Sequence, residues 1–183
     1  MKLLVPVLLC ITFILTGCAT PARMEQMVAP VQPAQRVVKT PLRDNVAVTE
    51  VTGGKETNPM CMSNVSSGEF ERALETSLRD VGLLSNGKQA GKYVLVANME
   101  KLDQPFIGIS MTVTASVQYT VIDRASRKEI FSRTIAIPYT ASFGDAFLGT
   151  ERLKMANEGA IRVNIAALIN ELFSLKLDAI AIQ

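Results

Sequence analysis

Apolar and polar residues alternate without interruption between residues 111 and 121. Every odd-numbered position carries an apolar or aromatic side chain, and every even-numbered position carries a hydroxyl or amide group, Ser116 among them. This period of two predicts an antiparallel strand with one face on a core and the other in water. A charged turn at 123–128 leads into the run 129–140, which predicts the partner strand. Pro138 near its end predicts either an edge position or a bulge.

Two other segments carry apolar residues at helical spacing. The motif Ser-Ser-Gly-Glu at 66–69 fits a capping box, and Gly82 stands where a helix C-cap belongs, which predicts a helix over 67–82. A second helix is predicted over 150–174, with Glu158 among the positions that are expected to face water.

The order of these elements defines the expected fold. Further strands are predicted at 45–51 and 92–98, on either side of the first helix. The order strand, helix, strand, strand, strand, helix predicts an α+β domain over residues 45–183. It has a single sheet of about four strands and two helices on one face, and a right-handed crossover makes the first two strands parallel.

The N-terminus carries a processing signal. The apolar run from Leu3 to Leu15 is too short for a helix that spans about 30 Å of hydrocarbon. Residues 1–17 are typical of a secretory signal peptide. Their last residues and Cys18, in the order Leu-Thr-Gly-Cys, resemble the lipobox of bacterial lipoproteins. The resemblance implies a diacylglycerol on the Cys18 sulfur and an N-acyl chain on its amino group, with no other cofactor.

The residues after the lipobox indicate where the protein works. Ala19 and Thr20 bear no likeness to the aspartate that marks inner-membrane retention in enterobacterial lipoproteins. The resemblance therefore implies a protein that is anchored to the outer membrane and faces the periplasm, without spanning the membrane. Four prolines among aperiodic residues predict that 18–44 is a semi-extended tether, which holds the domain away from the membrane.

Composition excludes several classes of activity. The chain contains no histidine, which excludes Ser-His-Asp and Cys-His catalysis and any imidazole base. A net charge of +2 argues against a nucleic-acid partner. Asp145 and Glu151 fit turn and first-turn chemistry, so no catalytic residue and no metal site is predicted. Cys61, the only thiol left after processing, is predicted either to be buried or to pair between molecules.

The quoted features also resemble a known group of lipoproteins. The lipobox, the strand-loop-helix of 45–82, the strand KYVLVANME and the hairpin VQYTVIDRASRKEIFSRT are similar to those of the curli-secretion lipoprotein and of penicillin-binding-protein activator lipoproteins. The resemblance covers most of 45–173 and implies their α+β fold. Function does not follow from the fold alone.

Three surfaces are candidates for binding a partner. Phe106 lies in a short apolar stretch, Phe143 and Phe147 precede the second helix, and Ser116 lies on the outward face of the alternating strand. Each has a structural alternative: the phenylalanines pack inward, and the outward face is only solvated.

These features favour a non-enzymatic, lipid-anchored accessory or assembly lipoprotein of envelope biogenesis or transport, which docks an envelope protein. A homo-oligomer and a small-molecule ligand stay open. One alternative is a subunit of an oligomeric outer-membrane secretion channel that uses the 110–140 hairpin. Another is an envelope enzyme that modifies acyl groups or sugars, although no nucleophile and base stand together in the sequence.

Overall fold

A four-stranded sheet forms one layer of the molecule. The computed structural model describes residues 19–58, 62–175 and 177. In this part of the chain the strands are β1 (Val46–Thr52), β2 (Tyr93–Asp103), β3 (Met111–Asp123) and β4 (Glu129–Ala141), in the order β1-β2-β3-β4. β1 pairs with β2 in parallel, and the other neighbours are antiparallel. The predicted α+β sheet is confirmed.

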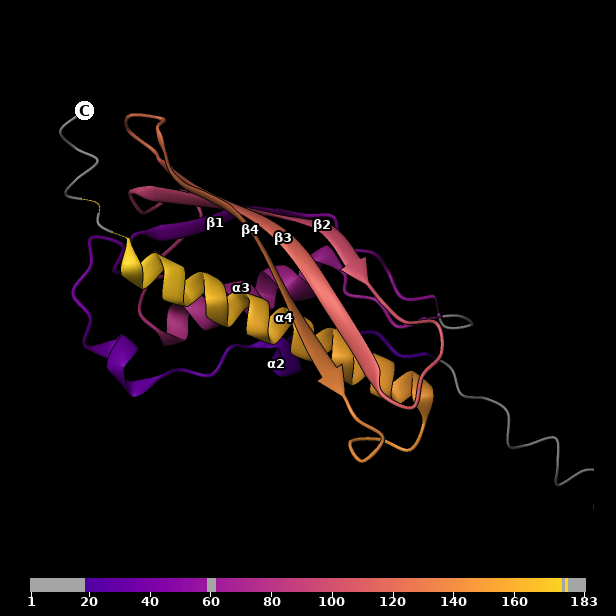
Figure 1. The fold of residues 1–183 in the computed structure, drawn as a ribbon. Coiled ribbons are helices and arrows are strands. Elements are labelled where there is room, and N and C mark those ends of the chain that lie inside the picture. The colour runs from indigo at the N-terminus through magenta and orange to yellow at the C-terminus, as the bar shows by residue number, and fades with distance from the viewer. Residues whose placement is uncertain (1–18, 59–61, 176, 178–183) are drawn as a thin grey trace, which may run out of the picture.

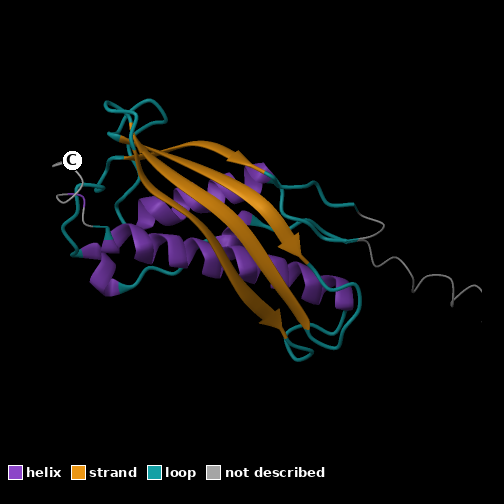
Figure 2. Ribbon diagram, turned by 45° about the horizontal axis from the view of Figure 1, so that its top comes forward, coloured by secondary structure: helices purple, strands orange, loops and turns teal. Residues whose placement is uncertain are grey.

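The helices lie together on one face of this sheet (Figures 1 and 2). They are α2 (Met24–Met27), a 3-10 helix (Pro33–Arg36), α3 (Ser67–Asp80) and α4 (Gly149–Ser174). α3 packs on β1, and α4 packs on β3 and β4. The two long helices were predicted from the sequence, whereas α2 and the 3-10 helix were not.

The ends of α3 follow local rules. The Ser66 hydroxyl accepts a hydrogen bond from the Glu69 N–H at 3.3 Å, and Gly82 adopts a φ of +73° just after the helix. The Glu69 carboxylate was expected to bond back to Ser66. Instead it accepts a hydrogen bond from the Met24 N–H at 3.1 Å, so it joins α3 to the N-terminal part of the chain.

The inner face of β3 forms the centre of the core. The odd-numbered side chains from Val113 to Val121 are completely buried, and the even-numbered ones point to the opposite face, as the alternation predicted. Pro138 lies on β4, which is an edge strand, so the edge is the alternative that the structure shows.

A buried amide attaches α4 to the sheet. The Asn164 Nδ2 group donates to the carbonyl oxygens of Ala115 and Ile135, each at 2.8 Å, and its Oδ1 accepts from the Tyr119 hydroxyl at 2.9 Å. Burial raises the pKa of Tyr119, which keeps the phenol protonated as a donor. Because every polar atom of this side chain has a partner, α4 has one favoured register on the sheet.

Residues 19–44, called the N-terminal segment below, pack against the helices. The prediction of a tether that holds the domain away is wrong for these residues, because Met27 and Leu42 are completely buried in the core. The Ala29 N–H donates to the Ser77 hydroxyl of α3 at 3.0 Å. The predicted signal peptide and Cys18 lie outside the described residues, as does Cys61.

The N-terminal segment runs parallel to α4, in the same chain direction. Its residues 23, 26 and 35 hydrogen-bond with residues 158, 162 and 170 of that helix, respectively. The segment therefore approaches the N-terminal end of α4 as it is followed back toward Ala19, as the indigo trace in Figure 1 shows.

This packing changes the environment of Glu158, which was predicted to face water. The side chain is buried beneath the N-terminal segment, so that prediction is wrong. Its Oε1 atom accepts from the Arg23 N–H at 3.0 Å and lies 3.8 Å from the Arg23 guanidinium. Burial raises the pKa of the Glu158 carboxyl, because a charge is costly away from water.

If the N-terminal segment is part of the folded core, truncating its buried side chains must destabilise the whole domain. Met27→Ala should lower the free energy of unfolding by about 2–5 kcal/mol, measured by urea denaturation. Val37→Ala is the matched control, because Val37 is 78% exposed in the same segment, and it should stay within about 0.5 kcal/mol of the parent. Equal urea midpoints for both variants would instead support the interpretation that residues 18–44 form a tether.

Candidate functional site

Two loops bring exposed apolar side chains together at one end of the molecule. They are the loop 104–110 between β2 and β3 and the loop 142–148 between β4 and α4, and together they are called the apolar tip below. Six large side chains of the tip are between 51% and 90% exposed: Phe106, Ile107, Ile109, Phe143, Phe147 and Leu148. The inward-packed alternative for the three phenylalanines is therefore wrong.

Arg152 of α4 connects the two loops. Its Nη1 atom donates to the carbonyl oxygens of Ala146 at 2.7 Å and Phe147 at 2.8 Å, and its Nη2 atom donates to that of Gly108 at 3.3 Å. The residue is buried, and its guanidinium lies 5.2 Å from the centre of the Phe143 ring. One buried cation thus sets the shape of both loops. Sequence reasoning missed it, because the partner carbonyls come from two distant segments.

A shallow hollow of about 400 Å³ lies between the loop 104–110 and the start of α4. Phe106, Ile107 and Met111 line one side, and Gly149 and Leu153 line the other. Phe143 and Phe147 meet edge to face, with ring centres 5.9 Å apart. The tip is therefore a preformed apolar surface.

The two loops contain a single charged residue, Asp145. Its carboxylate accepts from the N–H and the hydroxyl of Ser142 at 2.6 and 2.8 Å, and these hydrogen bonds lower the pKa of Asp145. Glu151 pairs instead with Lys154 at 2.7 Å. Both carboxylates have structural partners of their own, as expected for turn and first-turn residues.

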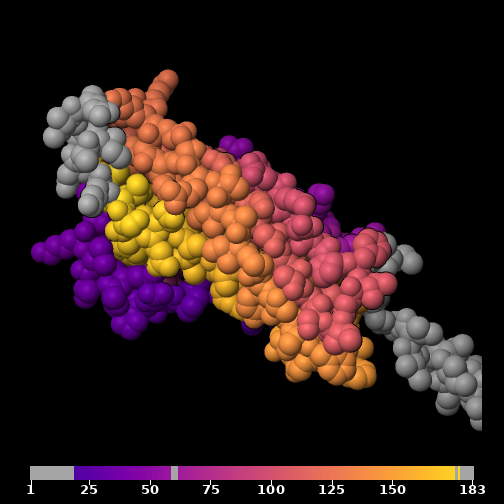
Figure 3. All heavy atoms as spheres, in the orientation of Figure 1, coloured from indigo at the N-terminus to yellow at the C-terminus, as the bar shows by residue number. Residues whose placement is uncertain are grey.

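Ser116 lies on the outer face of the sheet, which the helices leave uncovered (Figure 3). Hydroxyl and amide groups on this face pair across the strands, for example Gln118 Nε2 with Ser132 Oγ at 2.9 Å. The Thr112 and Thr140 hydroxyls lie 2.8 Å apart in the same way. The outer face is polar and the tip is apolar, so the sequence candidates fall on two surfaces of different chemistry.

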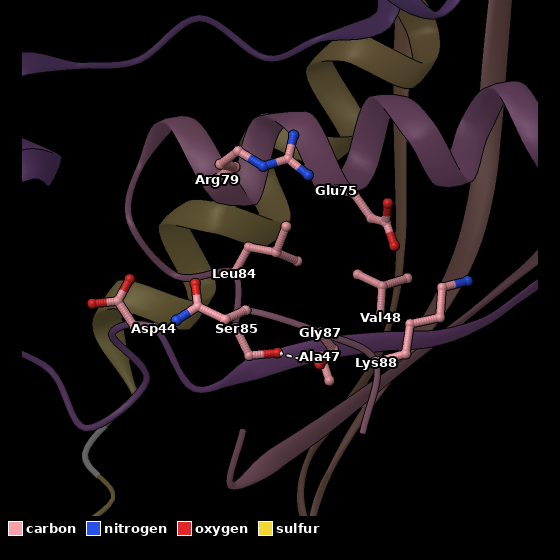
Figure 4. A pocket seen from close by; sticks show the side chains of 10 residues that line it. Asp44, Ala47, Val48, Glu75, Arg79, Leu84, Ser85, Gly87 and Lys88 are labelled. Carbon is pink, nitrogen blue, oxygen red and sulfur yellow. Dashed lines mark hydrogen bonds between the residues drawn. The ribbon is translucent and has the colours of Figure 1, made fainter. Parts of the chain in front are cut away.

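A third surface was not found from the sequence. A hollow of about 400 Å³ lies between β1 and α3, with Ala47 and Val48 of the edge strand on one side (Figure 4). Asp44, Glu75, Arg79 and Lys88 surround it, so its lining carries charges of both signs. Its residues come from three separate stretches of chain, 44–48, 75–79 and 84–88, and none of them forms a recognisable motif.

The described residues contain neither a metal-binding cluster nor a membrane-spanning helix. Over 19–58, 62–175 and 177, no group of three histidine, cysteine, aspartate or glutamate residues is placed to hold a metal ion. Within the same ranges no helix has both the length and the apolarity that crossing a membrane requires.

Comparison with known proteins gives structural similarity alone. No family model matches the chain, and no curated protein matches it significantly. The structure is similar to that of protein XCC0632 from Xanthomonas campestris, described with the family DUF330. The TM-score is 0.60 at 14% identity, over 83% of this chain and 94% of that one. This similarity shows a shared fold.

Two other solved structures have lower scores. A candidate lipoprotein from Caulobacter crescentus CB15 has a TM-score of 0.49 at 12% identity, over 73% of this chain and 90% of that one. A minor lipoprotein from Acinetobacter baumannii has a TM-score of 0.47 at 9% identity, over 73% and 94% of the two chains. The resemblance to curli-secretion and penicillin-binding-protein activator lipoproteins stays a prediction.

Replacing the Arg152 side chain should loosen both loops of the tip at once. Arg152→Met keeps the length of the side chain but removes its donors, which should cost about 1.5–3 kcal/mol of stability. Backbone amides in 104–110 and 142–148 should exchange with deuterium faster, as measured by mass spectrometry.

Arg133→Met is the control, because it breaks only an exposed ion pair with Glu171, which is worth about 0–1 kcal/mol. Faster exchange in only one loop of the Arg152→Met protein would show that the guanidinium does not connect the two.

Proposed function

We propose that this chain is a lipid-anchored lipoprotein on the periplasmic face of the outer membrane. In this proposal it acts as a non-enzymatic accessory or assembly subunit of envelope biogenesis or transport by docking a partner protein. The observation that carries the proposal is the lipobox-like motif that ends at Cys18, directly before the buried residue Ala19. A lipid on this cysteine would hold the domain at the membrane without a spanning helix.

The outer face of the sheet supports the docking part of the proposal. Within the described part of the chain, α2, α3, α4 and the N-terminal segment lie on the opposite face, which leaves the surface around Ser116 open to a partner (Figure 2). On β3 its side chains are uncharged hydroxyl and amide groups, and Thr112 and Gln118 are already ordered by cross-strand hydrogen bonds. Such a surface can bury against another protein at a low cost in side-chain entropy.

The buried face of the hairpin favours this role over the channel subunit. The apolar side chains of β3 from Val113 to Val121 are covered by α4 and form the core of the domain. A channel that used the 110–140 hairpin would have to expose this core or use the polar face alone.

Lipidation can be tested directly. The Cys18→Ala protein should fail to incorporate radiolabelled palmitate and should leave the membrane fraction, because it lacks the sulfur that carries the diacylglycerol. Cells that express the full chain would be fractionated and labelled in parallel, with Thr20→Ala as a nearby control that should behave like the parent. A Cys18→Ala protein that stays in the outer-membrane fraction would contradict the anchor.

Docking can be tested by photo-crosslinking in cells. A photoreactive amino acid in place of Ser116 should capture one defined envelope protein, because Ser116 lies within the open sheet face. The control is the same group in place of Ala125, an exposed residue in the turn between β3 and β4. The same set of adducts from both positions, or none from Ser116, would count against this docking surface.

A further inference from the structure

We propose that the apolar tip inserts into the membrane surface to which the N-terminus is anchored. Lipid, and not a protein, would then contact Phe106, Phe143 and Phe147. This inference rests on the proposed lipid anchor at Cys18.

The first argument is where the chain enters the domain. The Ala22 N–H donates to the Asn64 carbonyl at 3.2 Å, and the neighbouring Ser63 carbonyl accepts from Gln104 Nε2 at 2.9 Å. Gln104 is the first residue of the loop that carries Phe106. Two hydrogen bonds thus connect the start of the described chain to the tip, and Figure 1 shows both at the same end of the molecule.

The second argument is that the N-terminal segment contains no free linker between Ala19 and α2. Ala19 is only 5% exposed, and the packed segment follows it without a free linker as far as α2. The residue proposed to carry the acyl chains is covalently bonded to Ala19. An anchor at Cys18 would therefore hold this end of the folded domain against the membrane, and not at the distance that a tether allows.

The third argument is the chemistry of the tip. Six exposed phenylalanine, isoleucine and leucine side chains gather on two loops that carry one carboxylate and no exposed cation. Exposed apolar patches mark protein or membrane contacts, and burial of such side chains at the boundary of the acyl chains is favourable. Next to an acyl anchor, the membrane is the apolar phase that the tip meets first.

Arg152 prepares the tip for insertion. Its three hydrogen bonds satisfy loop carbonyl oxygens of Ala146, Phe147 and Gly108 from the protein side. These groups then need no water when the loops enter the lipid boundary, and the loops are already ordered. Arg152 is itself buried, with its guanidinium against the Phe143 ring, so insertion does not expose the cation to the hydrocarbon.

The chain allows a clean fluorescence test, because it contains no tryptophan. Phe106→Trp and Phe147→Trp each place a single indole on one loop of the tip, at positions 89% and 80% exposed. Val37→Trp is the control, also exposed but beside the 3-10 helix whose Gln35 binds Asn170 near the far end of α4. The 26 residues of α4 span about 39 Å at 1.5 Å per residue, so the control position lies far from the tip.

Each full-length, lipidated variant would be reconstituted into vesicles of phosphatidylethanolamine and phosphatidylglycerol, with and without brominated acyl chains. The fluorescence emission of both tip indoles should shift to shorter wavelength. Brominated lipid should quench most of that emission. The Val37→Trp emission should change little, because that indole stays in water.

The outcomes separate the tip from the anchor. Vesicles that carry the protein while the tip indoles keep their emission would overturn the insertion and leave the lipid anchor intact. Tip indoles that are shielded only when a captured envelope protein is added would assign the tip to a protein and overturn the inference. Failure of the lipidated chain to float with vesicles would overturn the anchor and the insertion together.

Discussion

The enclosure of α4 from two sides is the constraint on which the other parts of the structure depend. On one side Asn164 bonds to backbone carbonyls of β3 and β4, and on the other Glu158 receives the Arg23 N–H. Buried polar groups must be paired, so both contacts hold α4 in a fixed register. The same register places the start of α4, its Arg152 and both loops of the tip at the end where the N-terminal segment enters.

Local rules were sufficient to predict most of the sheet layer. The alternation of β3, the cap at Ser66, the turn at Gly82 and the edge position of Pro138 each depend on a few neighbouring residues, and each is observed. The exposed phenylalanines were also recognised as candidates. Their meeting at one tip was not predicted, because the two loops are separated by the whole β3–β4 hairpin and only the meander brings them together.

The N-terminal segment shows where sequence patterns fail. Its backbone bonds to side chains such as Ser77 and Glu158 and not to a neighbouring strand, so no period of burial develops along it. The segment residues that reach the core, such as Met27, Ala29 and Leu42, are spaced irregularly among prolines. Because this third layer was not foreseen, Glu158 appeared to face water. Gly159 of the same helix is needed where α4 approaches the sheet, since a Cβ there would meet the Tyr139 ring at 2.1 Å.

Residues 19–44 pack against the helices and do not form a tether, and this changes the physical argument for docking. A domain on a flexible tether samples many orientations, and a partner that binds it must offset the loss of that freedom. In the proposed arrangement the anchor and the tip fix the domain at two places on one membrane. The outer face around Ser116 then keeps a defined orientation, since it belongs to the same rigid sheet. Because the orientation of the domain is restricted before a partner binds, the effective concentration of that face for a partner in the envelope rises without any additional contact.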